Sequence, residues 1–310
     1  MPPSSRDDRS ANVPDDPGAT LTDLRPRDAG WPHLWRTLTD PPDQVTVSGR
    51  VGCLQSPCIA IVGTRKATPR GLAVARGLAA ALSHHGWTVV SGLALGIDAA
   101  AHRGSLDAGG AGVAVMATGI DVTYPVAHGR LRSRLERLGC CLTEFPAGTR
   151  PLPYHFPRRN RLIAGLARAV VVVEAPLKSG AMVTAYLALD YDREVFAVPG
   201  PVDLDTSRGC HHLLREGAHL LESCDDVHRV LPPPVPRPGP DAPAADRLPQ
   251  AGSPARWILD RLDLEGVSRD GLRRRWPGTE DMWVEGLLAL ELGGLIQRLP
   301  GGRLARTIWR

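Results

Sequence analysis

Lysine is almost missing from this chain of 310 residues. Of its 37 basic residues only Lys66 and Lys178 are lysines. Both stand in segments that follow apolar runs, where turns are expected. Two interpretations are open: an arginine-rich composition left two lysines by chance, or a lysine was kept at these places for a function. The net charge of +4 is mild and does not by itself indicate a nucleic-acid partner.

Cysteine and long apolar runs are also scarce. The six cysteines show no CxxC pair and no regular spacing, which argues against a disulfide scaffold and a zinc module. We therefore expect a reducing cytoplasm, no metal ion and no cofactor.

The longest stretch without an acidic or basic residue, 77–97, holds His84, His85 and Trp87, and is typical of helix, turn and strand rather than of a membrane span. The first ten residues have no apolar segment behind a basic head, so no signal peptide is expected.

Three sequence motifs of nucleotide and hydrolase chemistry are absent. No GxGxxG follows the first apolar strand, the segment GTRKATPRG does not fit the Walker A pattern, and no serine lies in GxSxG. Aromatic residues make up only 5% of the chain. The hydrophobic share of 43% and the charged share of 23% are nevertheless those of a folded globular protein.

Six apolar strands alternate with helical segments in the middle of the chain. The strands are expected at 58–64, 87–92, 112–118, 140–145, 169–175 and 194–200. This alternation predicts a doubly wound, mostly parallel α/β sheet.

The remaining segments divide the chain. Residues 1–30 are polar and aperiodic and are expected to be a disordered tail, ahead of the α/β domain at 31–230. Residues 231–254 contain nine prolines and are expected to be a linker. Residues 255–310 show three helical segments, with Ser268 as a predicted cap, and then a hairpin around Pro-Gly-Gly, which is the order of a winged-helix domain.

Cations gather in the loops that follow three of the predicted strands. In an open parallel sheet, ligands bind beyond the carboxyl ends of the strands, where helix N-termini attract anions. The cations there are Arg65, Lys66, Arg70, Arg158, Arg159, Arg161 and Lys178. They predict a site for a phosphate backbone. For single residues the alternative is structural: Arg65 can pair with a carboxylate, and 158–161 can form a solvated helix start.

Candidates for catalysis are few. Asp98 and His102 stand four residues apart and can pair, but we favour a role for Asp98 in fixing its own loop. Glu144 and Glu174 end strands at the same edge, where a carboxylate can act as a base or, as we favour, hold arginine side chains. The run 210–212, Cys-His-His, has metal-binding residue types, but neighbours in sequence cannot all face one ion. We therefore expect no enzymatic activity.

Taken in order, the strands and loops resemble the DNA-processing protein A (DprA/Smf) family over about residues 30–230. The segments that carry the resemblance are IAIVGTRKATPRG, VVSGLALGIDAAAH, AVMATGIDVTYP, LTEFPAG, HFPRRNRLIAGLARAVVVVEA, KSGAMVTA and VFAVPGPV. The resemblance implies an extended Rossmann-like fold that binds single-stranded DNA. It further implies a homodimer that protects incoming DNA and helps load a RecA-type recombinase during natural transformation and homologous recombination.

The same resemblance implies a set of strand-binding residues. They are Gly63, Arg65, Lys66, Gly119, Arg158, Arg159, Asn160, Arg161, Lys178, Ser179 and Gly180. Two departures from the family pattern are visible: Thr64 stands where serine is common, and only a polar tail precedes Trp31 where many members carry a small helical domain. With few aromatic residues near the loops, among them Tyr124, Tyr154 and Phe156, backbone contacts are expected to dominate.

Two other functions remain as alternatives. One is a nucleotide-cleaving enzyme of the lysine-decarboxylase-like group, whose PGGxGTxxE motif places a glutamate at the sheet edge. The corresponding KSGAMVTAYLALD has no carboxylate before Asp190, about three turns into its helix. The other is a pure protein-interaction module, against which the cationic loops argue. In the winged-helix segment, the third helix carries four acidic residues and no basic one, so we expect protein contact or regulation rather than reading of duplex sequence.

Overall fold

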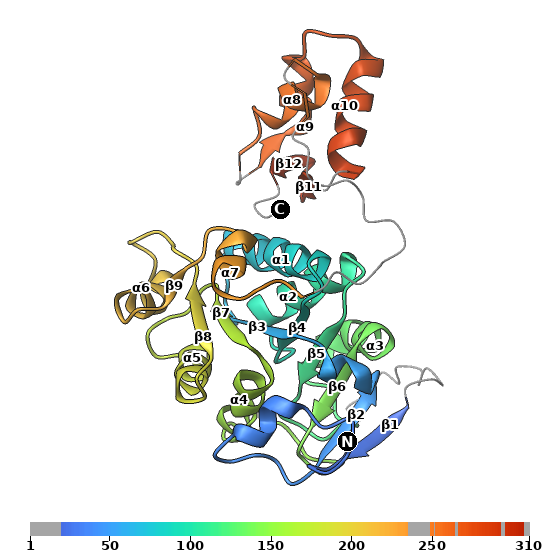
Figure 1. The fold of residues 1–310 in the computed structure, drawn as a ribbon. Helices are drawn as coiled ribbons and strands as arrows, with labels where there is room; N and C mark the ends of the chain where they lie inside the picture. The colour runs from blue at the N-terminus through green and yellow to red at the C-terminus, as the bar shows by residue number, and fades with distance from the viewer. Residues whose placement is uncertain (1–19, 235–248, 251, 264–265, 293–294, 307–310) are drawn as a thin grey trace, which may run out of the picture.

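The protein is described here by a computed structural model that covers residues 20–234, 249–250, 252–263, 266–292 and 295–306. Two sheets lie in this part of the chain, one of nine strands and one of three. Figure 1 shows helices on both faces of the larger sheet. The predicted doubly wound, Rossmann-like α/β fold is confirmed.

The nine-stranded sheet has the order β1-β2-β6-β5-β4-β3-β7-β8-β9. All pairs from β6 to β9 are parallel, and β1 and β2 add antiparallel pairs at one edge. The strands are β1 Leu21–Leu24, β2 Val45–Gly49, β3 Cys58–Val62, β4 Thr88–Ser91, β5 Gly112–Val115, β6 Cys140–Thr143, β7 Ala169–Val172, β8 Glu194–Ala197 and β9 His219–Leu220. The six predicted strands correspond to β3 to β8.

Helices cover the sheet in two layers because strand side chains alternate between its faces. Ile59 and Ile61 of β3 join the core formed with α1, α2 and α7, whereas Ala60 and Val62 join the core formed with α4, α5 and α6. The helices are α1 Pro69–His84, α2 Ile97–Asp107, α3 Gly129–Leu138, α4 His155–Leu166, α5 Gly180–Asp190, α6 Arg208–Arg215 and α7 Cys224–Val230. Burial on both faces explains why the central strands are continuous apolar runs.

The sheet begins earlier in the chain than the sequence indicates. Residues 1–19 lie outside the described residues, but Leu21–Leu24 is a strand, so the expectation of a disordered tail is wrong for this part. These four residues pair with β2, and Leu24 is buried while Thr22 and Asp23 stay near the surface. The sequence does not indicate this edge strand because it is short, half polar and without an apolar run. Pairing with β2 is what stabilises it.

The fourth loop is shorter than expected because α4 starts at His155 instead of near Arg159. Pro157 does not prevent this, since proline is tolerated in the first turn of a helix. The consequence is that residues 158–161 lie on a helix, and one turn of it cannot aim all their side chains at solvent.

The C-terminal segment has the order of a winged helix. It comprises α8 Pro254–Leu259, β10 Val267–Ser268, α9 Arg269–Arg274, α10 Glu280–Leu292, β11 Ile296–Leu299 and β12 Arg303–Arg306. Ser268 caps α9 by accepting a hydrogen bond from Gly271 N, as predicted. A separate apolar core, which includes Ile258, Leu272 and Trp283, fills this segment. Most of the proline-rich stretch, 235–248, lies outside the described residues.

Among the helices that the structure describes, none combines the length and the apolar composition needed to cross a bilayer.

Candidate nucleic-acid interface

A crevice opens where the strand order reverses. The strand β3 has β4 on one side and β7 on the other, and their connections leave in opposite directions. Such a switch point is where open α/β sheets bind ligands. Here the loop after β3 and the loop after β7 line a cavity of about 370 Å³, together with α2, α4 and the start of α5.

The loop after β3 is held by the end of β7. Thr64 N donates to the Glu174 carbonyl at 2.7 Å, and the Glu174 carboxylate accepts from Thr68 N at 2.9 Å. Gly63 fits only as glycine, because a Cβ there would lie 2.5 Å from Ile97. Glu174 therefore fixes the loop, not an arginine as we expected from the sequence. The tip of the loop, with Arg65 and Lys66, stays exposed.

The loop after β7 leads into α5 and carries the second lysine. Lys178 and Gly180 are exposed, and Ser179 caps α5 by accepting from Met182 N at 3.4 Å. The first N–H groups of an α-helix have no partner within the helix and favour an anion. The cap and the lysine together make this an electropositive wall of the cavity.

Arg159 forms the floor of the crevice and is buried, with 4% of its surface exposed. Its guanidinium donates to the carbonyl of Gly92 at 2.7 Å and to that of Val115. Gly92 is required there, since a Cβ would lie 2.3 Å from Arg159 Nη1. Burial lowers the pKa of Arg159 to about 10, and the nearby Asp98 opposes that shift.

Asp98 fixes its own loop, as predicted. Its carboxylate accepts from Gly92 N at 3.0 Å and from Ala94 N at 3.4 Å. Burial raises the pKa of Asp98, and Arg159 acts against that rise. His102 does not pair with it: neither of its ring nitrogens has a hydrogen-bond partner among the described residues.

Two other arginines of α4 converge on Glu144. Arg161, 6% exposed, forms an ion pair with Glu144 and donates to the Asp40 carbonyl at 2.8 Å. Arg158 is more exposed and lies 3.3 Å from the same carboxylate. Glu144 thus holds arginine side chains, as predicted from the sequence.

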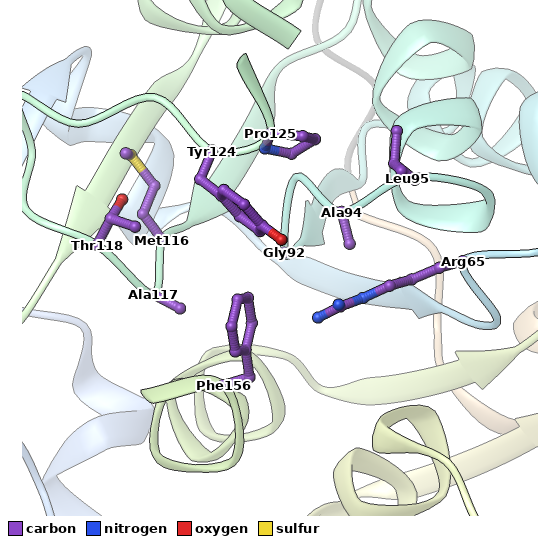
Figure 2. A pocket seen from close by; sticks show the side chains of 10 residues that line it. All are labelled: Arg65, Gly92, Ala94, Leu95, Met116, Ala117, Thr118, Tyr124, Pro125 and Phe156. Atoms are coloured by element: carbon purple, nitrogen blue, oxygen red, sulfur yellow. The ribbon is translucent and has the colours of Figure 1, made fainter. Parts of the chain in front are cut away.

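Aromatic rings flank the cationic crevice. Figure 2 shows Phe156 from α4 and Tyr124 on one side and Arg65 reaching towards them. The Arg65 guanidinium carbon lies 4.7 Å from the Phe156 ring centroid, and the two rings are 5.8 Å apart. Arg65, Tyr124 and Phe156 also line a neighbouring cavity of about 450 Å³ beside Pro151 and Pro153. Flat rings beside cations suit a chain of bases joined by phosphates.

The structure brings most of the predicted site residues together. Those that line the switch-point cavity are Gly63, Arg65, Lys66, Arg159, Asn160, Lys178, Ser179 and Gly180. Arg158, Arg161 and Gly119 are not part of its lining. Gly119 is buried and its N–H already donates to the Thr149 carbonyl at 2.9 Å.

One lining residue gave no sequence signal. Thr184 lies one turn into α5 and donates to the Gly180 carbonyl at 3.0 Å. Only its spacing of four residues from Gly180 places it on the same face of the helix.

A doubly wound sheet with an electropositive, aromatic-flanked crevice at its switch point defines a Rossmann-like protein with an anion-binding edge. The family model of DNA recombination-mediator protein A matches residues 23–232, and the chain belongs to that family.

Several curated proteins are similar to this chain. "Putative DNA processing protein DprA" of Mycobacterium tuberculosis is 52% identical over 168 residues, which cover 54% of this chain and 43% of that protein. The chain thus matches less than half the length of that relative. "Protein Smf" of Escherichia coli is 38% identical over 288 residues, which cover 89% of this chain and 75% of that protein.

Two solved structures share the fold. DNA processing protein A from Streptococcus pneumoniae has a TM-score of 0.66 and 38% identity, over 68% of this chain and 74% of that one. DNA processing protein A from Helicobacter pylori has a TM-score of 0.62 and 29% identity, over 67% of this chain and 94% of that one. The latter is described as having a single-stranded DNA binding mode.

Proposed function

We propose that this protein binds single-stranded DNA along the crevice between the loops after β3 and β7. The observation that carries the proposal is the switch-point cavity with exposed Arg65, Lys66 and Lys178 around it and with Phe156 and Tyr124 beside it. Cations on a groove neutralise phosphates, and rings beside it accept unstacked bases. The Helicobacter pylori relative, described as binding single-stranded DNA, supports this choice of polymer.

The predicted site residues take different roles in this proposal. Arg65, Lys66 and Lys178, with the N–H groups at Ser179 and Gly180, contact phosphates. Gly63 allows the DNA to approach the protein backbone closely, and Arg159 and Asn160 form the floor of the crevice. Arg158 contacts the DNA from the margin of the crevice. Gly119 and Arg161 support the loops around the crevice without touching DNA, because their polar groups already have partners in the protein.

The wider role that we propose is mediation of recombination. A homodimer of this protein would protect incoming single strands and help load a RecA-type recombinase during natural transformation. The family to which the chain belongs supports this role. No catalysis and no cofactor are part of the proposal.

The alternative, nucleotide cleavage, requires a carboxylate near the start of α5. The first one in that helix is Asp190 at its end, about 15 Å along the axis from Gly180. Incubation with nucleoside monophosphates should release no free base. Release of base that disappears in a Glu174→Gln or Asp98→Asn variant would favour the enzyme instead.

We also propose a division of the chain. The nucleic-acid-binding domain takes residues 31–230 together with β1, and 231–254 link it to a winged-helix domain at 255–310. The support is the division of the buried apolar residues. Three clusters belong to the sheet region and extend from Leu24 to Val227, and one separate cluster lies within 255–304.

The test is fluorescence anisotropy with an unstructured oligonucleotide over a series of salt concentrations. Each phosphate contact contributes about −0.7 to the slope of log affinity against log salt for a single strand. Lys178→Glu should weaken binding to all sequences alike and flatten the slope by about one unit. Arg215→Glu, an equal charge change at the exposed end of α6, is the control. Tighter binding to duplex, or a loss confined to some sequences, would contradict the proposal.

A further inference from the structure

Three side chains of the types that can bind a metal meet away from the crevice, at the packing contact of α1 and α7. One ligand atom each of His85, Cys224 and His228 lies within 4.8 Å of the others. Cys224 Sγ is 3.9 Å from His228 Nε2, and the two imidazole rings have centroids 4.5 Å apart. The sequence shows only part of this group: Cys224 and His228 stand four residues apart, whereas His85 comes from a distant segment of the chain.

The local structure aims these side chains at one another. Cys224 and His228 stand four residues apart on α7, so they share one face of the helix. His85 is the C-cap of α1, and the following Gly86 has a φ of +85° that turns the chain towards β4. This turn leaves the imidazole of His85 beside α7.

A neighbouring tryptophan defines the state of one imidazole. Trp87 Nε1 lies 3.3 Å from His228 Nε2, and an indole N–H can only donate. His228 Nε2 is therefore unprotonated, which is the form in which a histidine nitrogen binds a metal, and its lone pair accepts the indole N–H in the absence of an ion. Cys224 is buried, whereas His85 and His228 are half-buried, so an ion can enter from the imidazole side.

We propose that His85, Cys224 and His228 bind a divalent ion of the zinc class, with solvent as the fourth ligand. Thiolate and imidazole are the ligands that zinc prefers, and metal bonds of about 2.0–2.3 Å place ligand atoms roughly 3.3–3.6 Å apart in a tetrahedron. Side-chain adjustments of about 1 Å from the present separations reach that geometry. The bound ion replaces the thiol proton and takes the lone pair that Trp87 now contacts. It clamps α7, the last helix before the proline-rich stretch, onto the end of α1.

The experiment uses the full chain without a polyhistidine tag, stripped with a chelator and titrated with Co²⁺. One equivalent should produce a thiolate-to-cobalt charge-transfer band and strong visible bands of four-coordinate cobalt, and Zn²⁺ should abolish both. Cys224→Ala, His228→Ala and His85→Ala should each weaken binding by at least about 10–100-fold, the loss typical even for residues that only support a metal ligand. Exposed His84→Ala and Cys210→Ala, a buried thiol elsewhere, are matched controls and should bind like the parent chain.

Hydrogen exchange of α7 provides a second measurement on the unaltered chain. Zinc should slow the exchange of α7 amides and leave those of α10 unchanged. Binding that survives in a Cys224→Ala/His228→Ala double variant, or the absence of a thiolate band at one equivalent, would overturn the proposal. The cluster would then be a thiol–imidazole hydrogen bond with edge packing of two rings and no ion.

Discussion

The arginines at the crevice differ in whether their side chains are exposed or buried. Arg65 is exposed, and its described contact is with the face of Phe156. Arg159 is buried and donates to two carbonyls. An exposed guanidinium can turn to a phosphate without breaking the fold, whereas a buried one near Asp98 cannot leave without stranding a carboxylate.

The first prediction concerns Arg65→Ala. Loss of one charge-assisted phosphate contact should weaken single-strand binding by about 1.5–3 kcal/mol and leave the thermal midpoint unchanged. Anisotropy titration and thermal unfolding measure the two effects. Arg215→Ala should change neither, and an unaltered affinity and salt slope in Arg65→Ala would refute the contact.

A second prediction concerns His102, which is fully buried and has no hydrogen-bond partner in the part of the chain that the structure describes. Burial, and then the nearby His128, lower the pKa of His102 to about 3. Between pH 6.5 and 3 the unfolded chain binds a proton here that the folded chain does not. The contribution of neutral His102 to the free energy of unfolding is therefore fully present above pH 6.5. It falls by about 1.4 kcal/mol for each unit of pH between 6.5 and the folded-state pKa of about 3.

The variant His102→Leu removes this loss. It should unfold at higher urea than the parent chain at pH 7, since unpaired imidazole nitrogens are no longer buried, and the gap should widen at pH 5. Circular dichroism follows the transition. A gap that is the same at both pH values would show that His102 is protonated or solvated in the folded state.

Among the elements, α10 decides what the winged helix can do. Figure 1 shows it as the long helix of the C-terminal segment. Glu280, Asp281 and Glu285 on it are exposed, and no basic residue accompanies them. The arginines nearby are partly neutralised: Arg273 pairs with Glu280, and Arg298 lies 2.6 Å from Glu291.

A third prediction follows for the isolated segment 252–310. A helix that reads duplex sequence brings basic or amide side chains to the major groove, and this one brings carboxylates. The segment should bind duplex DNA weakly and lose that binding as salt rises. Anisotropy with random and selected duplexes measures it, and tight binding to one duplex near physiological salt would be incompatible with this assignment.

At the scale of the whole molecule, the sheet region and the C-terminal segment each have an apolar core of their own. Leu231 still packs against the core of α1, α2 and α7, whereas Ile258, Leu272 and Trp283 belong to the core of the C-terminal segment. The described interface residues all come from the sheet region. Removal of the C-terminal segment therefore takes no side chain from the crevice.

A fourth prediction is that a chain ending at Pro234 binds single strands about as well as the full chain. This end point keeps Leu231 in its packed position. The measurement is anisotropy with the same oligonucleotide at matched salt, beside the full chain. A drop of tenfold or more would place the main contacts in the C-terminal segment.

The sequence alone determined those features that depend on neighbours along the chain. Apolar runs such as 58–62 specify buried strands because both faces of a parallel sheet are covered, and Ser268 caps a helix through groups three residues away. Glycines and cations behind the strand ends located the crevice for the same reason.

Tertiary structure decided which side chains can use that location. Three of the residues 158–161 are arginines that the sequence does not distinguish, but α4 turns Arg159 and Arg161 inward to carbonyls and Glu144 and leaves Arg158 at the surface. The strand Leu21–Leu24 exists because β2 pairs with it. The meeting of His85 with Cys224 and His228 depends on the packing of α7 against α1. Burial and long-range pairing are properties of the packed chain, and no local pattern carries them.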